Sequence, residues 1–443
     1  MKAGGLYTAV GLLAVLGGLV WWTTKHPQTE TKKAAESPVI LKADPTRMEE
    51  IKITHLGSEP VVLKKVSDVW SITAPKAYAA DSEVVSPLTG SLGTITSERL
   101  IDEHPANLDP FGLAHPVEEV DVTMKGGKVY KIQLGSDTPA GGNTFLKLAD
   151  DPKVYTVSSA VKSDLDKSLN DLRDKRFMTF SSDKLTSIVL KAKGPEVDFT
   201  RNPDNDWQMV KPRLMRADNL LIDDMTRRLK DARMDMGTTY NEKEANSLFE
   251  AGAHIATVTT TEDGKTVQTF EVRRVKDKDG SYYAKSNLDP NAYKVVNDIG
   301  EGLDKDAEDF RAKKVFAFGF QDPTKLTIND KTYVKGGSKT EPKWTLNGVQ
   351  FDPITIEDVF DKLRDASAAE LTEKKGGTPT LTFDIVYGDK NHEEKVVFNK
   401  DGTTWRAMRG DDPDTVYVVD GKVVEDIQKV VGAIKQYQPP AKK

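Results

Sequence analysis

The first pattern along the chain is an uncharged, apolar stretch over residues 3–24, AGGLYTAVGLLAVLGGLVWWTT. As a helix rising ~1.5 Å per residue, it would span about 33 Å, which is enough to cross the hydrocarbon core of a bilayer. It is longer than the apolar region of a cleavable signal peptide, and it ends in Trp21 and Trp22, which favour the membrane interface. We therefore predict an uncleaved transmembrane signal anchor over residues 1–24. Residues 25–45 lack helical or strand periodicity and are predicted to be a linker.

The rest of the chain repeats one pattern, marked by Trp70, Trp207 and Trp344 at equal spacings of 137 residues. In the first two copies, a Pro and then an Ala-Asp pair follow the Trp at the same offsets, and apolar residues at helical spacing come next. Asp81 and Asp218 are the expected N-caps of these helices. The third copy shows the same helical spacing after Asp352-Pro353, shifted by about three residues.

Each copy continues with two runs of alternating apolar residues around a Gly-containing turn, which is typical of a β-hairpin. The turns lie at 125–128, 263–264 and 388–389. A further strand pair follows, and each copy closes with apolar residues at i, i+4, i+8 and i+11, which predicts one continuous helix over 161–172, 299–310 and 423–434. From Trp to hairpin turn is 56 residues in the first two copies (70–126, 207–263) but 44 in the third (344–388), so the third lacks a loop.

These patterns predict an α+β protein with three tandem repeats of a mixed helix and antiparallel-hairpin unit behind one N-terminal transmembrane helix. The expected units cover residues 46–182, 183–318 and 319–443, the last with a shortened loop. A chain of 443 residues is long enough for three domains.

Composition and charge exclude several classes of protein. The chain has 69 acidic and 63 basic residues, a net charge of −6 and no strongly basic block, which argues against nucleic-acid binding. It contains no cysteine, which excludes disulfides, thiolate nucleophiles, zinc-thiolate sites and a lipoprotein anchor.

No pattern of catalytic or ligand-binding residues stands out. None of the six histidines forms an HxxxH or HxH pair, and the loop Gly135–Thr144 fits neither phosphate-binding glycine motif. We interpret the carboxylate pairs as solvated charge in turns or on helix surfaces; they are Glu118-Glu119, Asp150-Asp151, Asp223-Asp224 and Asp411-Asp412. We therefore predict no catalytic, cofactor-binding or metal-binding residues, no cofactor, and no enzymatic activity.

Two sets of residues are candidates for interactions or for the junctions between units. The repeated Trp residues are expected to anchor the cores, with lining of a groove between units as the alternative. The basic motifs LRDKR and FRAKK lead from one unit into the next, so we favour salt bridges across the junction over anion binding. The candidates are Trp70, Trp207, Trp344, Arg173, Lys175, Arg176, Arg311, Lys313 and Lys314.

Four segments carry a resemblance to a known family. They are the Trp-x4-Pro-x4-Ala-Asp run from Trp70, FGLAHP at 111–116, LGSDTPAGGNTFLKL at 134–148 and LNDLRDKRFMTF at 169–180. Together they resemble the bacterial domain-of-unknown-function family 4340. The resemblance is densest over residues 51–180, is echoed in the second copy and is poor in the third. It implies a protein that is anchored by one N-terminal helix and faces away from the cytoplasm. Members of the family are often encoded beside gliding-motility-type ABC transporter components. The family has no established catalytic residues.

The expected function follows from this resemblance and from the anchor. Lys2 and Lys25 flank the apolar stretch, so the positive-inside rule does not decide the orientation, but the short N-terminal side favours a body exported to the periplasmic side of the inner membrane. The resemblance implies a non-catalytic accessory or binding subunit of a cell-envelope ABC-type transport system, with permease or ATPase subunits as protein partners. The alternatives are a structural scaffold subunit of another membrane complex and an envelope hydrolase, which would need a cleft with convergent, unpaired polar groups.

Overall fold

The computed structural model describes residues 38–203, 205–237, 240–276, 279–296, 299–338 and 341–439. The predicted signal anchor over 1–24 and residues 25–37 of the predicted linker lie outside the described residues, so they stay predictions. The described end of the predicted linker instead forms the strand β1 (Val39–Lys42), which pairs with a second strand and buries Leu41 in the first core. No helix in the described ranges is long and apolar enough to cross a membrane.

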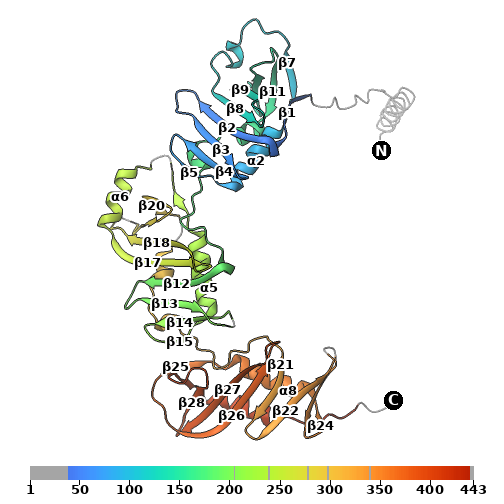
Figure 1. The fold of residues 1–443 in the computed structure, drawn as a ribbon, viewed down its shortest axis with the longest axis vertical. Helices are drawn as coiled ribbons and strands as arrows, with labels where there is room; N and C mark the ends of the chain where they lie inside the picture. Colours follow the sequence, from blue (N-terminus) through green and yellow to red (C-terminus); the bar gives the residue numbers. More distant parts are fainter. Residues whose placement is uncertain are drawn as a thin grey trace, which may run out of the picture. The chain divides into compact units, whose positions relative to one another are not determined.

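The described chain forms three sheets of nine strands each, and every strand pairing in them is antiparallel (Figure 1). The first sheet has the order β5 (Tyr78–Ala79), β4 (Val69–Ala74), β3 (Val61–Val66), β2 (Met48–His55), β8 (Glu118–Met124), β9 (Val129–Asp137), β10 (Asn143–Leu148), β11 (Val154–Ser158), β7 (Arg99–Asp102). The second sheet has the order β15 (Met215–Arg216), β14 (Trp207–Lys211), β13 (Val197–Arg201), β12 (Leu185–Lys191), β17 (Ala253–Glu262), β18 (Thr266–Arg274), β19 (Tyr282–Ser286), β20 (Asp289–Val295), β16 (Met234–Asp235). The third sheet has the order β24 (Val349–Phe351), β23 (Pro342–Leu346), β22 (Lys331–Gly337), β21 (Pro323–Ile328), β26 (Thr378–Tyr387), β27 (His392–Asp401), β28 (Thr404–Arg409), β29 (Val416–Val419), β25 (Ala368–Thr372).

The three sheets share one topology. In each, the first four strands form a meander, and the fifth strand along the chain pairs at the far edge, beside the ninth. The predicted hairpins are confirmed as β8–β9, β17–β18 and β26–β27. The α+β class with three similar sheet units is therefore confirmed. We call each sheet with its own helices a sheet unit.

A capped helix follows the fourth strand of each sheet. These helices are α2 (Ser82–Gly93), α5 (Asn219–Asp231) and α8 (Pro353–Asp365). The expected N-caps are confirmed, because Asp81 accepts a hydrogen bond from the N–H of Glu83 at 2.9 Å and Asp218 accepts one from Leu220 at 3.0 Å. Asp352 caps α8 in the same way.

Each of these helices covers one face of its own sheet (Figure 1). In the first sheet unit, Val85, Leu88 and Leu92 of α2 belong to the same buried cluster as the strand residues Ile51 and Val122. The other two sheet units have equivalent clusters built with α5 and α8. The apolar side chains of the helix and the inward-facing side chains of the strands therefore pack into one hydrophobic core in each sheet unit.

The prediction of a continuous closing helix is right for the third copy and wrong for the first two. The third copy forms α9 (Gly421–Gly432), whereas the first forms α3 (Ser159–Leu165) and α4 (Leu169–Leu172), and the second forms α7 (Gly300–Leu303) and the 3-10 turn η4 (Glu308–Phe310). Where the third copy has Val430, the first has Ser168 and the second has Asp306, and both of these side chains accept hydrogen bonds from backbone N–H groups. Such bonds compete with helix continuation.

The loop that the third copy lacks carries different structure in the other two. In the first sheet unit it contains the 3-10 turn η2 (Asp109–Phe111), and in the second it contains α6 (Glu242–Ala251). The remaining elements are the two-stranded sheet of β1 (Val39–Lys42) with β6 (Thr94–Thr96) and the 3-10 turns η1 (Pro45–Arg47) and η3 (Ser182–Lys184).

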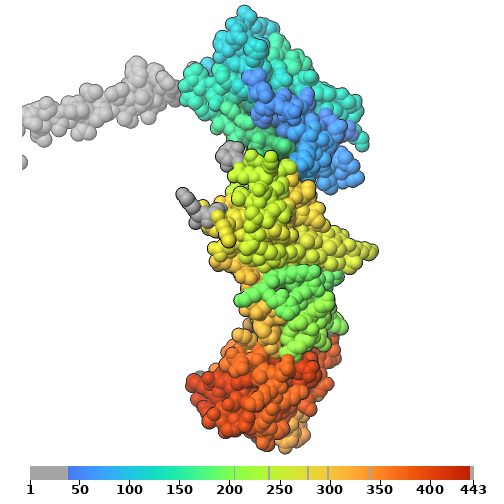
Figure 2. Space-filling view, turned by 90° about the vertical axis from the view of Figure 1, so that its left-hand side faces the viewer, coloured from blue at the N-terminus to red at the C-terminus, as the bar shows by residue number. Residues whose placement is uncertain are grey.

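The chain divides into two compact units after Lys175. The first sheet unit lies in the first compact unit, and the other two sheet units share the second. Within the second compact unit, Arg216 donates to the hydroxyl of Tyr417 at 3.1 Å, and Figure 2 shows green residues of the second sheet unit in contact with red residues of the third. The finer division into three domains, at residues 46, 183 and 319, stays a prediction.

Candidate functional site

The three repeated Trp side chains lie in or against the cores. Trp207 and Trp344 are buried in the second and third clusters, and Trp70 is half-buried against the first. The guanidinium of Arg201 lies over the Trp207 ring, 3.9 Å from its centroid. Trp207 also lines the cleft described below.

Arg173 of the first basic motif packs against its own sheet unit, whereas the backbone of Arg176 forms a β-bridge with Arg233 in the second sheet unit. Arg173 is buried, its guanidinium lies 4.0 Å from the ring centroid of Tyr78, and its backbone forms a β-bridge with Ala80. Lys175 is half-buried and Arg176 is exposed.

The second basic motif contacts both sheet units of the second compact unit. Arg311 is buried, pairs at 2.8 Å with Glu308 of η4, three residues before it, and donates to the Thr415 hydroxyl at 3.1 Å in the third sheet unit. The ion pair of Arg311 therefore stays in the second sheet unit, and its contact with the third sheet unit is a hydrogen bond. The Lys314 ammonium donates to the carbonyl of Arg364 at 3.0 Å. Lys313 is exposed, and its carbonyl accepts from the N–H of Ala368 at 2.8 Å.

A cleft of about 1010 Å³ lies in the second compact unit, between residues of its two sheet units. Three apolar side chains on its lining are strongly exposed: Leu214 at 65%, Leu220 at 78% and Phe320 at 99%. Among the described lining residues, seven are Asp and three are Lys or Arg. We call it the acidic cleft.

One carboxylate pair at the acidic cleft is not simply solvated, which corrects the prediction for Asp411-Asp412. Asp411 accepts two hydrogen bonds from Arg409, at 2.8 and 2.7 Å, and the buried Arg409 also pairs with the buried Glu394. Partial loss of water contact acts to raise the pKa of Asp411, but the hydrogen bonds and charge of Arg409 outweigh it and hold that pKa below its ordinary value. Asp412 is buried and accepts from the Tyr417 hydroxyl at 2.8 Å.

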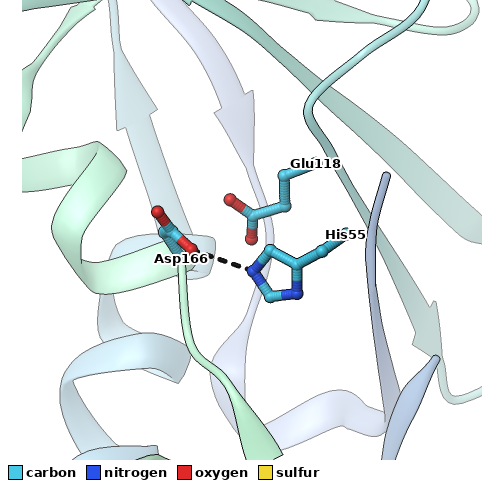
Figure 3. Close-up of side chains that lie close together, drawn as sticks. All are labelled: His55, Glu118 and Asp166. Carbon is cyan, nitrogen blue, oxygen red and sulfur yellow. Dashed lines mark hydrogen bonds and ion pairs between the residues drawn. The ribbon is translucent and has the colours of Figure 1, made fainter. Parts of the chain in front are cut away.

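A cluster of ionisable side chains lies in the first compact unit, formed by His55, Glu118 and Asp166 (Figure 3). His55 is the last residue of β2 and Glu118 is the first residue of β8, and the two are direct cross-strand partners. Asp166 follows α3 as its C-cap. One potential ligand atom from each side chain lies within 4.8 Å of the other two. We call these three residues the His55 cluster.

The three side chains of the His55 cluster differ in their contact with solvent. His55 Nε2 lies 2.9 Å from Asp166 Oδ1, and these two side chains are 29% and 47% exposed. Glu118 is only 2% exposed, and its Oε1 is buried without a hydrogen-bond partner among the described residues. In Figure 3 the Glu118 carboxylate faces both His55 and Asp166.

Burial, and to a smaller extent the negative charge of Asp166, raise the pKa of Glu118 to about 8. The positive charges of Lys162 and Lys167 act in the opposite direction but are weaker. Lys162 pairs with Asp137 at 2.8 Å, and Lys167 donates to the carbonyl of Ser163 at 2.6 Å. A carboxyl group in this setting is held neutral at pH 7 unless a cation compensates its charge.

Sequence reasoning missed the His55 cluster and was wrong to place Glu118 in a solvated pair. The strand β8 begins at Glu118 and buries every second residue from there, so Glu118 is its first inward-facing residue. That alternation was the available signal, because Glu118 stands in the inward register ahead of Val120 and Val122. The pairing with His55 could not be deduced from spacing, because β2 and β8 are neighbours in the sheet but not along the chain.

Comparison with known proteins identifies one family. Neither a curated protein nor a solved structure matches the chain significantly. A family model described as a domain of unknown function (DUF4340) matches residues 70–206 and again residues 207–384. The two matches begin at Trp70 and Trp207, the residues that mark the first two copies of the repeat in the sequence. Both matches start inside a sheet, in β4 and β14. Because these matches cover more than half of its residues, the chain belongs to the DUF4340 family.

Proposed function

We propose that this protein is a non-catalytic, membrane-anchored accessory subunit of a cell-envelope ABC-type transport system, and that it binds a partner protein with its extracytoplasmic body. Membership of the DUF4340 family supports the proposal through the expectations attached to that family. The apolar stretch over residues 3–24 supports the anchor.

The acidic cleft is the observation that carries the binding role. Single exposed apolar side chains are common on protein surfaces, but Leu214, Leu220 and Phe320 line one cleft together. The surplus of Asp on the described lining creates a negative potential, so the favoured occupant is a segment of a membrane partner that carries both basic and apolar side chains.

The test is co-purification from native membranes. The full chain is expressed at native level, solubilised in mild detergent and recovered with its partners, which are identified by mass spectrometry. The variant Leu214→Asp/Phe320→Asp removes apolar contact and adds negative charge at the cleft. We expect it to reduce recovery of the main partner by about tenfold, which corresponds to about 1.4 kcal/mol of binding free energy.

The matched control is Leu288→Asp, because Leu288 is also an exposed apolar residue of the second compact unit but does not line the cleft. It should leave recovery unchanged. A partner list without an ATPase or permease would reject the transport role and favour a scaffold in another membrane complex. Recovery of the chain as a lone monomer would reject both.

A further inference from the structure

We propose that His55, Glu118 and Asp166 form a binding site for one divalent cation of the zinc type in the first compact unit. Among the described residues, this cluster is the one place where three such ligand groups converge. The inference is independent of the acidic cleft, which lies in the other compact unit.

The backbone fixes the positions of the three ligands. His55 and Glu118 are cross-strand partners, so β-sheet pairing sets their separation, and Asp166 is held at the end of α3, where its N–H donates to the carbonyl of Lys162. Ligand atoms within 4.8 Å of one another need only small side-chain adjustments to reach metal-ligand distances of about 2 Å. The exposed edge at Asp166 and His55 gives a cation a path from solvent to the buried Glu118.

The repeats show that the fold does not require a carboxylate at position 118. Val120, Val258 and Phe383 occupy one equivalent position, because each pairs with a buried residue of the first strand of its sheet, namely Ile53, Leu190 and Ile328. Two residues before them stand Glu118, Ala256 and Leu381, all buried. Two of the three sheet units therefore place an apolar side chain where the first has Glu.

The buried Glu118 therefore lowers the stability of the fold, and the sheet architecture does not require a carboxylate at this position. A buried carboxyl oxygen without a partner destabilises a folded protein, whereas Ala or Leu at the same position would not. The side chains that face Glu118 are also potential metal ligands. They are the half-buried His55 and the carboxylate of Asp166, which come from two other elements. A divalent cation would satisfy the free oxygen and compensate both carboxylates.

The ligand types select the kind of cation. Imidazole nitrogen is a good ligand for zinc and neighbouring transition metals, and carboxylate oxygen binds them as well. Magnesium and calcium prefer all-oxygen sites, so one imidazole among three ligands disfavours both of them. Three protein ligands also leave at least one coordination position for water or for a group from a partner.

Isothermal titration calorimetry tests the site directly. The full chain, without a polyhistidine tag, is dialysed against a chelator in detergent micelles and titrated with ZnCl₂. We expect one zinc ion per chain, and no saturable binding of Mg²⁺ or Ca²⁺ at the same concentrations. His55→Gln, Glu118→Gln and Asp166→Asn should each weaken zinc affinity by at least about tenfold.

The matched control is His104→Gln, because His104 is an exposed histidine of the same compact unit outside the cluster. It should bind zinc like the unaltered chain. Asp166→Asn changes an exposed side chain, so it keeps the test decisive even where a change at the buried Glu118 prevents folding. The proposal is overturned by an absence of saturable zinc binding, or by equal zinc affinity in the folded cluster variants and in the control.

Discussion

Glu118 and His55 face each other across β8 and β2 as direct partners in the first sheet, and the Glu118 oxygen Oε1 is buried there without a hydrogen-bond partner among the described residues. The equivalent positions of the other two sheets hold Ala256 and Leu381. The first sheet unit therefore differs from its repeats at a core position, and the difference creates a group of ligands where the repeats have only packing.

Replacing Glu118 by the residue of the third repeat should separate stability from metal binding. We expect Glu118→Leu to raise the free energy of unfolding of the metal-free protein by about 1–3 kcal/mol, because it removes a buried carboxyl oxygen without a partner. The same change should abolish stabilisation by zinc. Hydrogen exchange of the β2 and β8 amides measures the effect locally.

The neighbouring Glu119→Leu is the control for this prediction. Glu119 is exposed and accepts a hydrogen bond from Gln133, so its replacement should change stability by no more than about 0.5 kcal/mol. Destabilisation by Glu118→Leu in the absence of metal would mean that the carboxyl group has a structural partner.

The repeat architecture was predictable because its signals are local. Apolar spacing after Asp81 and Asp218, and alternation around Gly-containing turns, are properties of short segments that sequence displays directly. The breaks in the closing helices depend instead on whether one side chain bonds to the backbone. Ser168 and Asp306 do so, and Val430 at the same position cannot. The spacing of apolar residues is the same in all three copies, so it does not reveal that difference.

The His55 cluster was beyond prediction for a different reason. Its three residues come from β2, β8 and the end of α3, and they meet only because the sheet order places the first strand beside the sixth. Sequence spacing carries no information about that order. The inward position of Glu118 in an otherwise apolar strand face could have marked one ligand, but not its two companions.

Arg311 should contribute to the stability of the second compact unit. Because it is buried and donates to both Glu308 and Thr415, Arg311→Ala should lower the free energy of unfolding of this unit by about 2 kcal/mol, as measured by urea denaturation. Arg311→Lys should recover only part of the loss, since an ammonium lacks the planar fork of the guanidinium. The exposed neighbour Lys313→Ala should cost no more than about 0.5 kcal/mol. An equal effect of the two alanine variants would contradict a role for the Arg311 side chain.

Asp411 should make the second compact unit sensitive to acid. Its pKa is lowered in the folded protein, so its contribution to stability is present above the unfolded pKa of about 3.9 and is lost as the pH falls through the lower, folded value. We expect Asp411→Asn to cost about 1 kcal/mol at pH 7, a modest value because this carboxylate remains largely exposed. Urea denaturation from pH 7 to pH 2 should show the difference from the unaltered chain shrinking below about pH 4. A difference that stays constant with pH would show that the charge is not responsible.

Zinc removal should lower the thermal stability of the first compact unit alone. A ligand that binds only the folded state at one hundred times its dissociation constant adds about 2.7 kcal/mol to the free energy of unfolding. Hydrogen exchange during heating should therefore show later opening of β2 and β8 with zinc than with a chelator, and no change in β12 or β17, which belong to the second compact unit. His55→Gln should remove this dependence on zinc, and His104→Gln should retain it. Equal protection of both compact units by zinc would indicate non-specific binding and would contradict a site at the His55 cluster.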